Sequence, residues 1–306
     1  MSEIVVEARG LSKTYGKYKA VDNVSFSLAK GSLVGLVGKN GAGKTTLIRL
    51  MSGLIKPSEG EVALFGQFDP IHHPKMLERV STMVEYPALY PTMTARENLL
   101  SACILKGVKD PIKSGYIKEK LEFVGLGELY DSSKKAKNYS LGMKQRLGIA
   151  MAYIGEPELM FLDEPTNGLD PEGIEDVRRL LIRVNERGTT ILVSSHILSE
   201  LSRFAKDYLF MDRGQIVEHI SAEELEHSVG KRVYLHTDDD EKLLKTLVER
   251  GFHAERSGDG LCVTGVGESA DLINLLFAQG FRLLSYREED NSLEDRFLSL
   301  LGGEGK

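Results

Sequence analysis

The segment GKNGAGKTT, residues 38–46, has the composition and spacing of a phosphate-binding loop. Gly38, Gly43, Lys44 and Thr45 fit the pattern G-x-x-x-x-G-K-[ST]. The glycines allow the backbone to wrap closely around a phosphate, and a following helix N-terminus adds positive potential. Lys44 can reach the β- and γ-phosphates of a nucleotide, and the Thr45 hydroxyl can ligate Mg²⁺. The other candidate ATP-binding residues of this loop are Asn40, Gly41 and Thr46.

Two further segments end in residues that could act on a bound nucleotide. LMFLDEP, residues 159–165, places Asp163 and Glu164 directly after four apolar residues, at the tip of an expected buried strand. Asp163 is a candidate for holding Mg²⁺ through water, and Glu164 for polarising an attacking water. ILVSSH, residues 191–196, ends a second such strand at His196, whose neutral imidazole could contact a γ-phosphate. An ordinary strand end that meets solvent is the alternative for each segment.

These segments need a parallel sheet to bring them together. SLVGLVG, LMFLD and TTILVSS are short apolar, β-branched runs, and helical patterns follow or separate them. Strands that alternate with helices indicate a parallel sheet covered on both faces, with ligands bound at the carboxyl ends of the strands. Between about residues 95 and 152 the apolar residues recur at helical spacing, which predicts a helical subdomain over about residues 86–152.

Composition limits the class of protein. The 306 residues are 42% apolar and 27% charged, with a net charge of −6. A protein that binds the phosphate backbone of a nucleic acid needs a basic stripe, so we expect no nucleic-acid partner. Cys103 and Cys262 are too far apart in sequence for a disulfide framework or a metal-ligand spacing. The N-terminus does not resemble a signal peptide, and no apolar run approaches the ~20 residues of a membrane-spanning helix. We therefore expect a cytoplasmic protein.

The C-terminal part of the sequence after about Ser221, called the tail here, has a different pattern of apolar residues. We expect a domain boundary near residues 221–230. The pattern predicts a strand, a helix, a hairpin, a second helix, a strand and a last helix in SLEDRFLSLLG. The pieces LLKTLVERGF and LINLLFAQGF match each other, which suggests two βα halves of a small ferredoxin-like α/β domain over residues 228–306. Residues 1–225 would form the nucleotide-binding domain. The tail shows no catalytic constellation, and we expect it to stabilise a dimer or to bind a regulatory ligand.

The segment NYSLGMKQRLGIAMA, residues 138–152, resembles a divergent signature segment of ATP-binding-cassette (ABC) ATPases. The usual LSGGQ-type core is present as Tyr139-Ser140-Leu141-Gly142-Met143. The P-loop precedes this segment, and LMFLDEP follows it. Together with the other motifs, the resemblance to the family covers roughly residues 3–220. It implies a P-loop NTPase fold of the ABC type with ATP and Mg²⁺ as cofactors.

The resemblance also implies roles for residues outside the phosphate loop. NGLD, ending at Asp170, resembles the D-loop, Tyr15 in SKTYG corresponds to the aromatic residue that stacks on adenine, and His196 matches the switch histidine. In the family, Ser140 and Gly142 would face the γ-phosphate that is held by the other subunit. Two chains would then clasp two ATP molecules head to tail and separate after hydrolysis.

One position departs from the family pattern. MVEYPALYP, residues 83–91, carries Glu85 where most of the family has a Gln that touches Mg²⁺ or the attacking water. This departure, the YSLGMKQR signature and the tail resemble the branch that exports, or gives immunity to, bacitracin and lantibiotics. A carboxylate could ligate Mg²⁺ more strongly than an amide; a solvated loop charge is the alternative. We expect Glu85→Gln to affect the coupling to transport more than ATP hydrolysis.

The resemblance therefore implies the ATP-hydrolysing subunit of an exporter. It would work as a dimer with separate transmembrane permease subunits, peripheral on the inner face of the membrane. The segment from Tyr86 to about Ala152 would dock the permease, since its prolines and tyrosines form a firm, partly apolar surface. Two alternatives remain: a weakly hydrolysing regulatory half of a heterodimer, and a soluble ABC ATPase unconnected with transport. The sequence does not identify the cargo.

Overall fold

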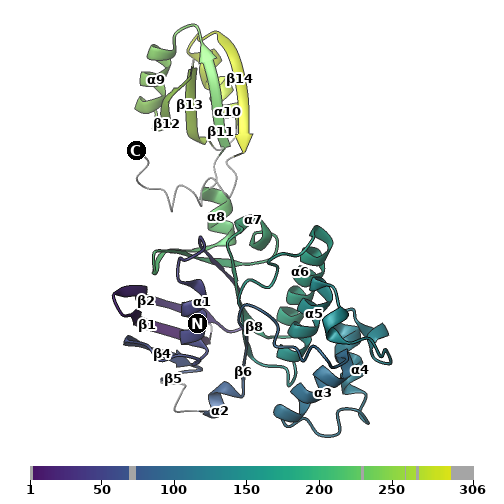
Figure 1. Cartoon of the computed structure of the whole chain (residues 1–306). Coiled ribbons are helices and arrows are strands. Elements are labelled where there is room, and N and C mark those ends of the chain that lie inside the picture. The colour runs from purple at the N-terminus through teal and green to yellow at the C-terminus, as the bar shows by residue number, and fades with distance from the viewer. Residues whose placement is uncertain (1–2, 69–73, 229–230, 259, 267–268, 291–306) are drawn as a thin grey trace. The chain divides into compact units, whose positions relative to one another are not determined.

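The computed structural model describes residues 3–68, 74–228, 231–258, 260–266 and 269–290. The chain divides into two compact units, Met1–Ser221 and Ala222–Lys306 (Figure 1). The expected last helix, SLEDRFLSLLG, lies outside the described residues. Within the described residues, no helix is long and apolar enough to cross a membrane.

The first unit contains two sheets. An antiparallel sheet has the order β2-β1-β4-β5, formed by β1 (Ile4–Tyr15), β2 (Tyr18–Ala29), β4 (Glu59–Leu64) and β5 (Gln67–Phe68). The second sheet has the order β10-β9-β3-β8-β7-β6. Its strands are β3 (Leu33–Val37), β6 (Val80–Met83), β7 (Leu159–Leu162), β8 (Thr190–Ser195), β9 (Asp207–Asp212) and β10 (Gln215–Ser221).

The second sheet is parallel from β9 to β6, and only β10 runs antiparallel, at the edge. Strands β3, β7 and β8 are buried along their whole length, which explains their continuous apolar runs. The expected parallel sheet is therefore present. Its strand order is not the order of the sequence, since β3 lies between β8 and β9.

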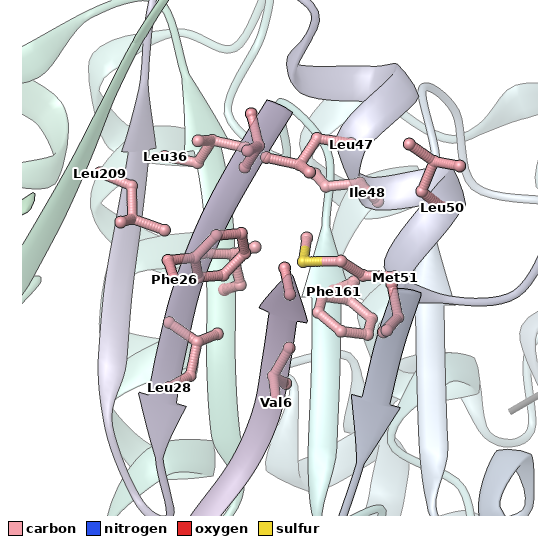
Figure 2. Close-up of a cluster of buried hydrophobic side chains, with 14 of the residues drawn as sticks. Val6, Phe26, Leu28, Leu36, Leu47, Ile48, Leu50, Met51, Phe161 and Leu209 are labelled. Carbon is pink, nitrogen blue, oxygen red and sulfur yellow. The ribbon is translucent and has the colours of Figure 1, made fainter. Parts of the chain in front are cut away.

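Helix α1 (Lys44–Met51) packs in the core between the two sheets (Figure 2). Leu47, Ile48 and Met51 are fully buried against side chains such as Val6 of β1 and Phe161 of β7. The apolar residues of this helix lie on one side, which is covered by the core, while Thr45, Thr46 and Arg49 lie outside it. This packing fixes the helix N-terminus at the carboxyl ends of the parallel strands.

The remaining helices of this unit are α2 (Pro74–Leu77), α3 (Ala95–Leu105), α4 (Tyr116–Phe123), α5 (Leu141–Ala152), α6 (Pro171–Glu186) and α7 (Leu198–Leu201). Two 3₁₀ turns, η2 (Gly127–Leu129) and η3 (Ala136–Asn138), lie between α4 and α5. Helix α3 begins with a complete capping box formed by Thr94 and Glu97. Helices α3, α4 and α5 pack on one another, in the region where the sequence predicted a helical subdomain.

The second unit begins with α8 (Ala222–Ser228). Its four-stranded antiparallel sheet has the order β12-β13-β11-β14, formed by β11 (Lys231–Thr237), β12 (His253–Ser257), β13 (Gly260–Val266) and β14 (Leu283–Asp290). Helix α9 (Asp240–Glu249) connects β11 to β12, and α10 (Ser269–Ala278) connects β13 to β14. This element order is the ferredoxin-like β-α-β-β-α-β pattern, with a separate small core around Val233, Leu243 and Leu272.

Candidate functional site

The loop over residues 38–43 joins β3 to α1 and packs closely against its neighbours. Gly43 has a φ of 107°, and a Cβ at this position would lie 2.3 Å from the carbonyl oxygen of Ala20. A Cβ at Gly38 would lie 2.4 Å from the carbonyl oxygen of Met211. Larger residues would displace the backbone at both positions. The two glycines therefore hold the loop in the shape that leads into the N-terminus of α1.

Lys44 is the first residue of α1, and its side chain folds back over the loop. Only 6% of the residue is exposed, and the Nζ atom donates a 2.6 Å hydrogen bond to the carbonyl oxygen of Gly38. The same ammonium group lies 3.1 Å from Oε1 of Glu164. That oxygen is buried and makes no bond with hydrogen-bond geometry, so its contact with Lys44 is electrostatic.

Asp163 follows β7 and is held by hydroxyl groups from two other elements. Thr45 Oγ1 donates to Asp163 Oδ2 at 2.7 Å, and Ser194 Oγ donates to Asp163 Oδ1 at 2.6 Å. The backbone N–H of Glu164 donates to Ser194 Oγ at 2.9 Å. Asp163 is 1% exposed, so these contacts compensate the burial of its carboxylate.

Glu164 lies between the phosphate loop and His196. Nδ1 of His196 lies 2.9 Å from Glu164 Oε2, while Glu164 Oε1 faces Lys44. Strands β7 and β8 pair in parallel with Leu162 opposite Val193, so the residues that follow them meet at one edge of the sheet. Glu164 has a φ of 49°, a left-handed conformation that is rare for a residue with a side chain. The structure thus brings together three of the predicted site residues.

A cavity of about 210 Å³ opens above the phosphate loop. Its lining includes Asn40, Gly41, Gly43, Lys44, Thr45, Thr46, Glu164, Ala20 and Tyr18. Tyr15 is not part of this lining; its ring lies 5.3 Å from Lys13 Nζ, and the residue is 48% exposed. Tyr15 and Tyr18 are cross-strand neighbours in the hairpin of β1 and β2, and the Tyr18 hydroxyl donates to the carbonyl oxygen of Gly41 at 3.4 Å.

Ser140, Gly142 and Asp170 line a second cavity of about 510 Å³, which shares no lining residue with the first. Ser140 caps α5 by accepting the N–H of Met143, and Asp170 caps α6 by accepting the N–H of Gly173. Two helix N-termini therefore open into this cavity, and each adds positive potential there. The lining also carries Arg146 and the carboxylates of Asp170, Glu172 and Asp176.

Tyr139 anchors the signature segment to the helical region. Its hydroxyl accepts the N–H of Ala95 and donates to the carbonyl oxygen of Lys134, both at 3.0 Å. Burial raises the pKa of the Tyr139 phenol, so the group stays neutral and can donate. Tyr139, the first residue of the signature sequence, therefore binds the N-terminus of α3.

Glu85 lies at the corner after β6, where its side chain is 58% exposed. Its Oε1 accepts a 2.7 Å hydrogen bond from Nη2 of Arg49, on α1. No hydrogen bond between Glu85 and Thr45, Asp163 or Glu164 occurs in the described part of the chain. Glu85 shares with Glu164 a left-handed backbone, at φ 61°. Since Met83 pairs with Leu162, the two glutamates occupy equivalent positions beyond neighbouring strands.

Sequence reasoning missed Ser194, Tyr18 and Arg49. Ser194 is the second-last residue of β8. Its side chain points to the side of the strand on which Asp163 lies, and it bonds that carboxylate. Tyr18 could have been found from its place across a two-residue turn from Tyr15. Arg49 follows Thr45 by four residues, which is the spacing of one helix face.

The residues suited to Mg²⁺ are the oxygen donors of Thr45 and Asp163. In the described residues, no group of three or more His, Cys, Asp or Glu side chains is arranged to hold a metal ion. Mg²⁺ commonly uses one or two protein oxygens, with water and substrate phosphates as the other ligands. The 2.7 Å pair of Thr45 and Asp163 beside the phosphate loop fits that mode.

Comparisons with known proteins agree with this geometry. The family model for ABC transporters matches residues 21–167. The chain is 38% identical to the bacitracin transport ATP-binding protein BcrA of Bacillus licheniformis, over 98% of both chains. It is 35% identical to the lantibiotic transport ATP-binding protein SrtF of Streptococcus pyogenes, over 75% of this chain and 97% of that protein.

Solved structures of ATP-binding cassettes are also similar to this chain. The ADP conformation of MJ1267, an ATP-binding cassette of an ABC transporter, superposes with a TM-score of 0.63 at 26% identity, covering 74% of this chain and 94% of the other. A dimeric post-hydrolysis state of the cassette MJ0796, bound to ADP and Pi, gives a TM-score of 0.63 at 26% identity and covers 71% and 98% of the two chains.

Proposed function

The chain belongs to the family of ABC transporter ATP-binding proteins, and from this premise we propose that it drives the export of an antimicrobial peptide, a drug or a similar compound. ATP hydrolysis would supply the energy for this transport, and the observation that supports hydrolysis is the set of contacts of Glu164 with Lys44 and His196 beside the phosphate loop. The class of transported compound is supported by relatives named for bacitracin and lantibiotic transport.

In the proposed mechanism, Lys44 and the loop hold the terminal phosphates while Glu164 activates water. Lys44 exchanges its contact with the Gly38 carbonyl for phosphate oxygens, and the N-terminus of α1 adds positive potential. Glu164 accepts the proton of the attacking water. His196 holds the Glu164 carboxylate in place by donating a hydrogen bond from Nδ1. A contact of the same ring with a γ-phosphate oxygen requires that Nε2 also carries a proton, because both partners are acceptors.

Thr45 and Asp163 are the residues proposed to hold Mg²⁺, Thr45 through its hydroxyl and Asp163 through water. The bound ion would supply positive charge against the phosphate oxygens. Ser194 orients the Asp163 carboxylate, so that the acidic group is fixed before a metal arrives. Glu85 is proposed as a further residue near the metal when ATP is bound.

A dimer is proposed because the signature cavity is separate from the phosphate loop of the same chain. Ser140, Gly142 and Asp170 would meet the γ-phosphate bound to a second copy. Each ATP would then be gripped by the phosphate loop of one chain and the signature of the other. Hydrolysis removes the charge shared between them, and the two chains separate.

The proposed permease site is a groove of about 380 Å³ between the corner after β6 and helices α3 and α5. Its lining includes Met83, Tyr86, Pro87, Tyr90, Leu105 and Met151. Tyr86 is 76% exposed and Leu105 is 81% exposed, which is unusual for large apolar side chains. The groove fits an amphipathic helix of a membrane subunit, which would hold the chain on the cytoplasmic face.

Leu105→Arg should reduce co-purification of a membrane permease by about tenfold, because it places a charge in an apolar docking site. The matched control is Ile104→Arg, since Ile104 is also exposed on α3 but does not line the groove. The measurement is mass spectrometry of the proteins retained with the tagged chain after mild detergent extraction. Equal retention by both variants, or no membrane protein retained by the parent, would contradict the permease proposal.

Tyr18→Ala should weaken ATP binding at least about fivefold, because base–aromatic stacking contributes about 1–3 kcal/mol and about 1.4 kcal/mol corresponds to a factor of ten. Tyr18 lines the cavity above the phosphate loop, and Tyr15, the residue that the family resemblance assigns to adenine, is its cross-strand neighbour. The measurement is titration calorimetry with ATP and with inorganic tripolyphosphate, which lacks a base. A loss that is equal for both ligands would show that Tyr18 shapes the loop instead of contacting adenine.

A further inference from the structure

The backbone of Glu164 is in a left-handed conformation that neighbouring contacts must hold. Its φ of 49° is rare for a residue with a side chain, and such conformations persist only where the surrounding structure fixes them. On the N-terminal side, the N–H of Glu164 donates to Ser194 Oγ at 2.9 Å. On the C-terminal side, the Glu164 carbonyl oxygen accepts the N–H of Asn167 at 3.1 Å, which closes a turn that contains Thr166. The direction of the Glu164 side chain therefore depends on this turn.

Thr166 bonds to the segment that carries His196. Its Oγ1 donates a 2.6 Å hydrogen bond to Oε2 of Glu200, across 34 positions of the sequence. Thr166 is 7% exposed, so its hydroxyl group needs a partner within the protein. A hydroxyl–carboxylate contact of this length is among the stronger hydrogen bonds that a protein makes. The turn after Glu164 is thus fastened to a second element of the fold.

Glu200 lies on a firmly packed element. It belongs to α7, whose Leu198 and Leu201 are buried. A Cβ added at Gly35 of β3 would lie 3.0 Å from Cδ1 of Leu201, so α7 packs directly on the central sheet. Glu200 follows His196 by four residues, and the same short segment therefore carries both side chains.

Three contacts connect the segment after β7 with the end of β8 and the segment after it. Ser194 accepts the N–H of Glu164, and Nδ1 of His196 lies 2.9 Å from the Glu164 carboxylate. Thr166 and Glu200 make the third contact. A general base must also face the attacking water, so the contact with His196 cannot alone position the Glu164 carboxylate. The other two contacts do not involve this carboxylate, and they can hold its backbone throughout the reaction.

We infer that Thr166 and Glu200 are positioning residues for ATP hydrolysis. Their hydrogen bond fixes the turn after Glu164 against the segment after His196, and with it the direction in which the Glu164 carboxylate faces the phosphate loop. The cavity above this loop is lined by Glu164 but by neither Thr166 nor Glu200. Misplacing a catalytic group by about 1 Å can cost about a hundredfold in rate. The inference rests on the proposed function, because it requires Glu164 to be the catalytic base.

The test measures kcat and KM for ATP from phosphate release, with ATP binding followed by calorimetry. Thr166→Val removes the hydroxyl group at nearly constant volume, and Glu200→Met removes the acceptor. Each should lower kcat at least about tenfold and leave ATP affinity within about twofold of the parent, because the contact positions Glu164 and not the nucleotide. Thr166→Ser keeps the donor and Glu200→Gln keeps an acceptor oxygen, so both should stay within about threefold of the parent kcat.

The matched control is Thr189→Val. Thr189 Oγ1 donates to the carbonyl oxygen of Pro157 at 2.8 Å, which joins the segments before β8 and β7 at the opposite edge of the sheet. Thr189 is 3% exposed, so this variant also loses a buried hydroxyl contact, but away from Glu164. Thermal melting checks that each variant folds. Of the two valine variants, only Thr166→Val should lower kcat.

A second comparison separates positioning from general damage to the fold. In a Glu164→Gln background the catalytic base is already absent, so Thr166→Val should change the residual rate less than about twofold. The residual rate is measured in single turnover with radiolabelled ATP. Thr166→Val combined with Glu200→Met should lose no more kcat than either single change, because both remove the same contact.

The outcomes separate this inference from the proposed function. If Thr166→Val folds and keeps the parent kcat, the inference is wrong. It is also wrong if Thr166→Val lowers the rate by the same factor in the Glu164→Gln background, since Thr166 would then act without Glu164. Should Thr166→Val fail to fold, a Glu200→Met variant with the parent kcat overturns the inference in its place, because Glu200 is partly exposed and can be replaced without a cavity. If the parent is no faster than Glu164→Gln, the proposed role of Glu164 fails first, and the inference fails with it.

Discussion

Glu164→Gln is expected to lower ATP hydrolysis by about two to four orders of magnitude while ATP still binds, because general base catalysis contributes a factor of about 10²–10⁴. Glutamine has nearly the same shape as glutamate, and its side-chain oxygen can still meet Nδ1 of His196. It cannot accept the proton of the attacking water at neutral pH. The measurement is phosphate release by the purified chain, with binding followed by calorimetry.

The control is Glu158→Gln, which changes a carboxylate next to the opposite end of the same strand, where Glu158 pairs with Arg79. This variant should hydrolyse ATP at the parent rate. A parent chain that is no faster than Glu164→Gln would contradict the catalytic role of Glu164. That result would instead favour a regulatory subunit that hydrolyses weakly.

Lys44→Met is expected to weaken ATP binding by at least about a hundredfold. Hydrogen bonds to charged groups contribute about 1.5–3 kcal/mol each, and two phosphate contacts together correspond to roughly 10²–10⁴ in affinity, at 1.4 kcal/mol for each factor of ten. Methionine keeps the length of the side chain but removes the ammonium group. The measurement is calorimetry with ATP and, separately, with tripolyphosphate, and both ligands should lose affinity by similar factors.

The control is Lys39→Met in the same loop, where the side chain is exposed. A small effect of this control would show that the loss at position 44 does not come from a general reduction in positive charge. Lys44→Met also leaves the buried Glu164 Oε1 without its nearby cation, so a lower melting temperature is expected. Unchanged ATP affinity in Lys44→Met would contradict the phosphate-binding role of the loop.

Much of the site could be predicted because its chemistry lies in short contiguous segments. The loop from Gly38 to Thr46 carries its glycines, cation and hydroxyl within nine residues, and polar residues that act at the site directly follow β7 and β8. Continuous apolar runs indicated buried parallel strands, since a strand covered on both faces has no polar side. The small second unit was likewise indicated by its alternation of strands and helices and by its two matching segments.

Other features depend on which strands become neighbours. The hydroxyl of Thr45 meets Asp163 across 118 positions of the sequence, and His196 meets Glu164 across 32. Ser194 bonds Asp163 only because β8 lies beside β7, and Tyr18 lines the cavity only because the hairpin of β1 and β2 passes beside the loop. A pattern of apolar residues reports which face of a strand is buried, but it does not report the partner or the register.

The sequence by itself therefore determined the type of chemistry, the family and the kind of sheet that supports the site, because these follow from local spacing and local backbone preference. Only the tertiary structure decided that Glu164 is shared between Lys44 and His196, and that Glu85 is held by Arg49. The physical reason is that charged side chains act over a few ångströms, and such distances between remote residues are fixed only when the strands pair and α1 is packed between the sheets.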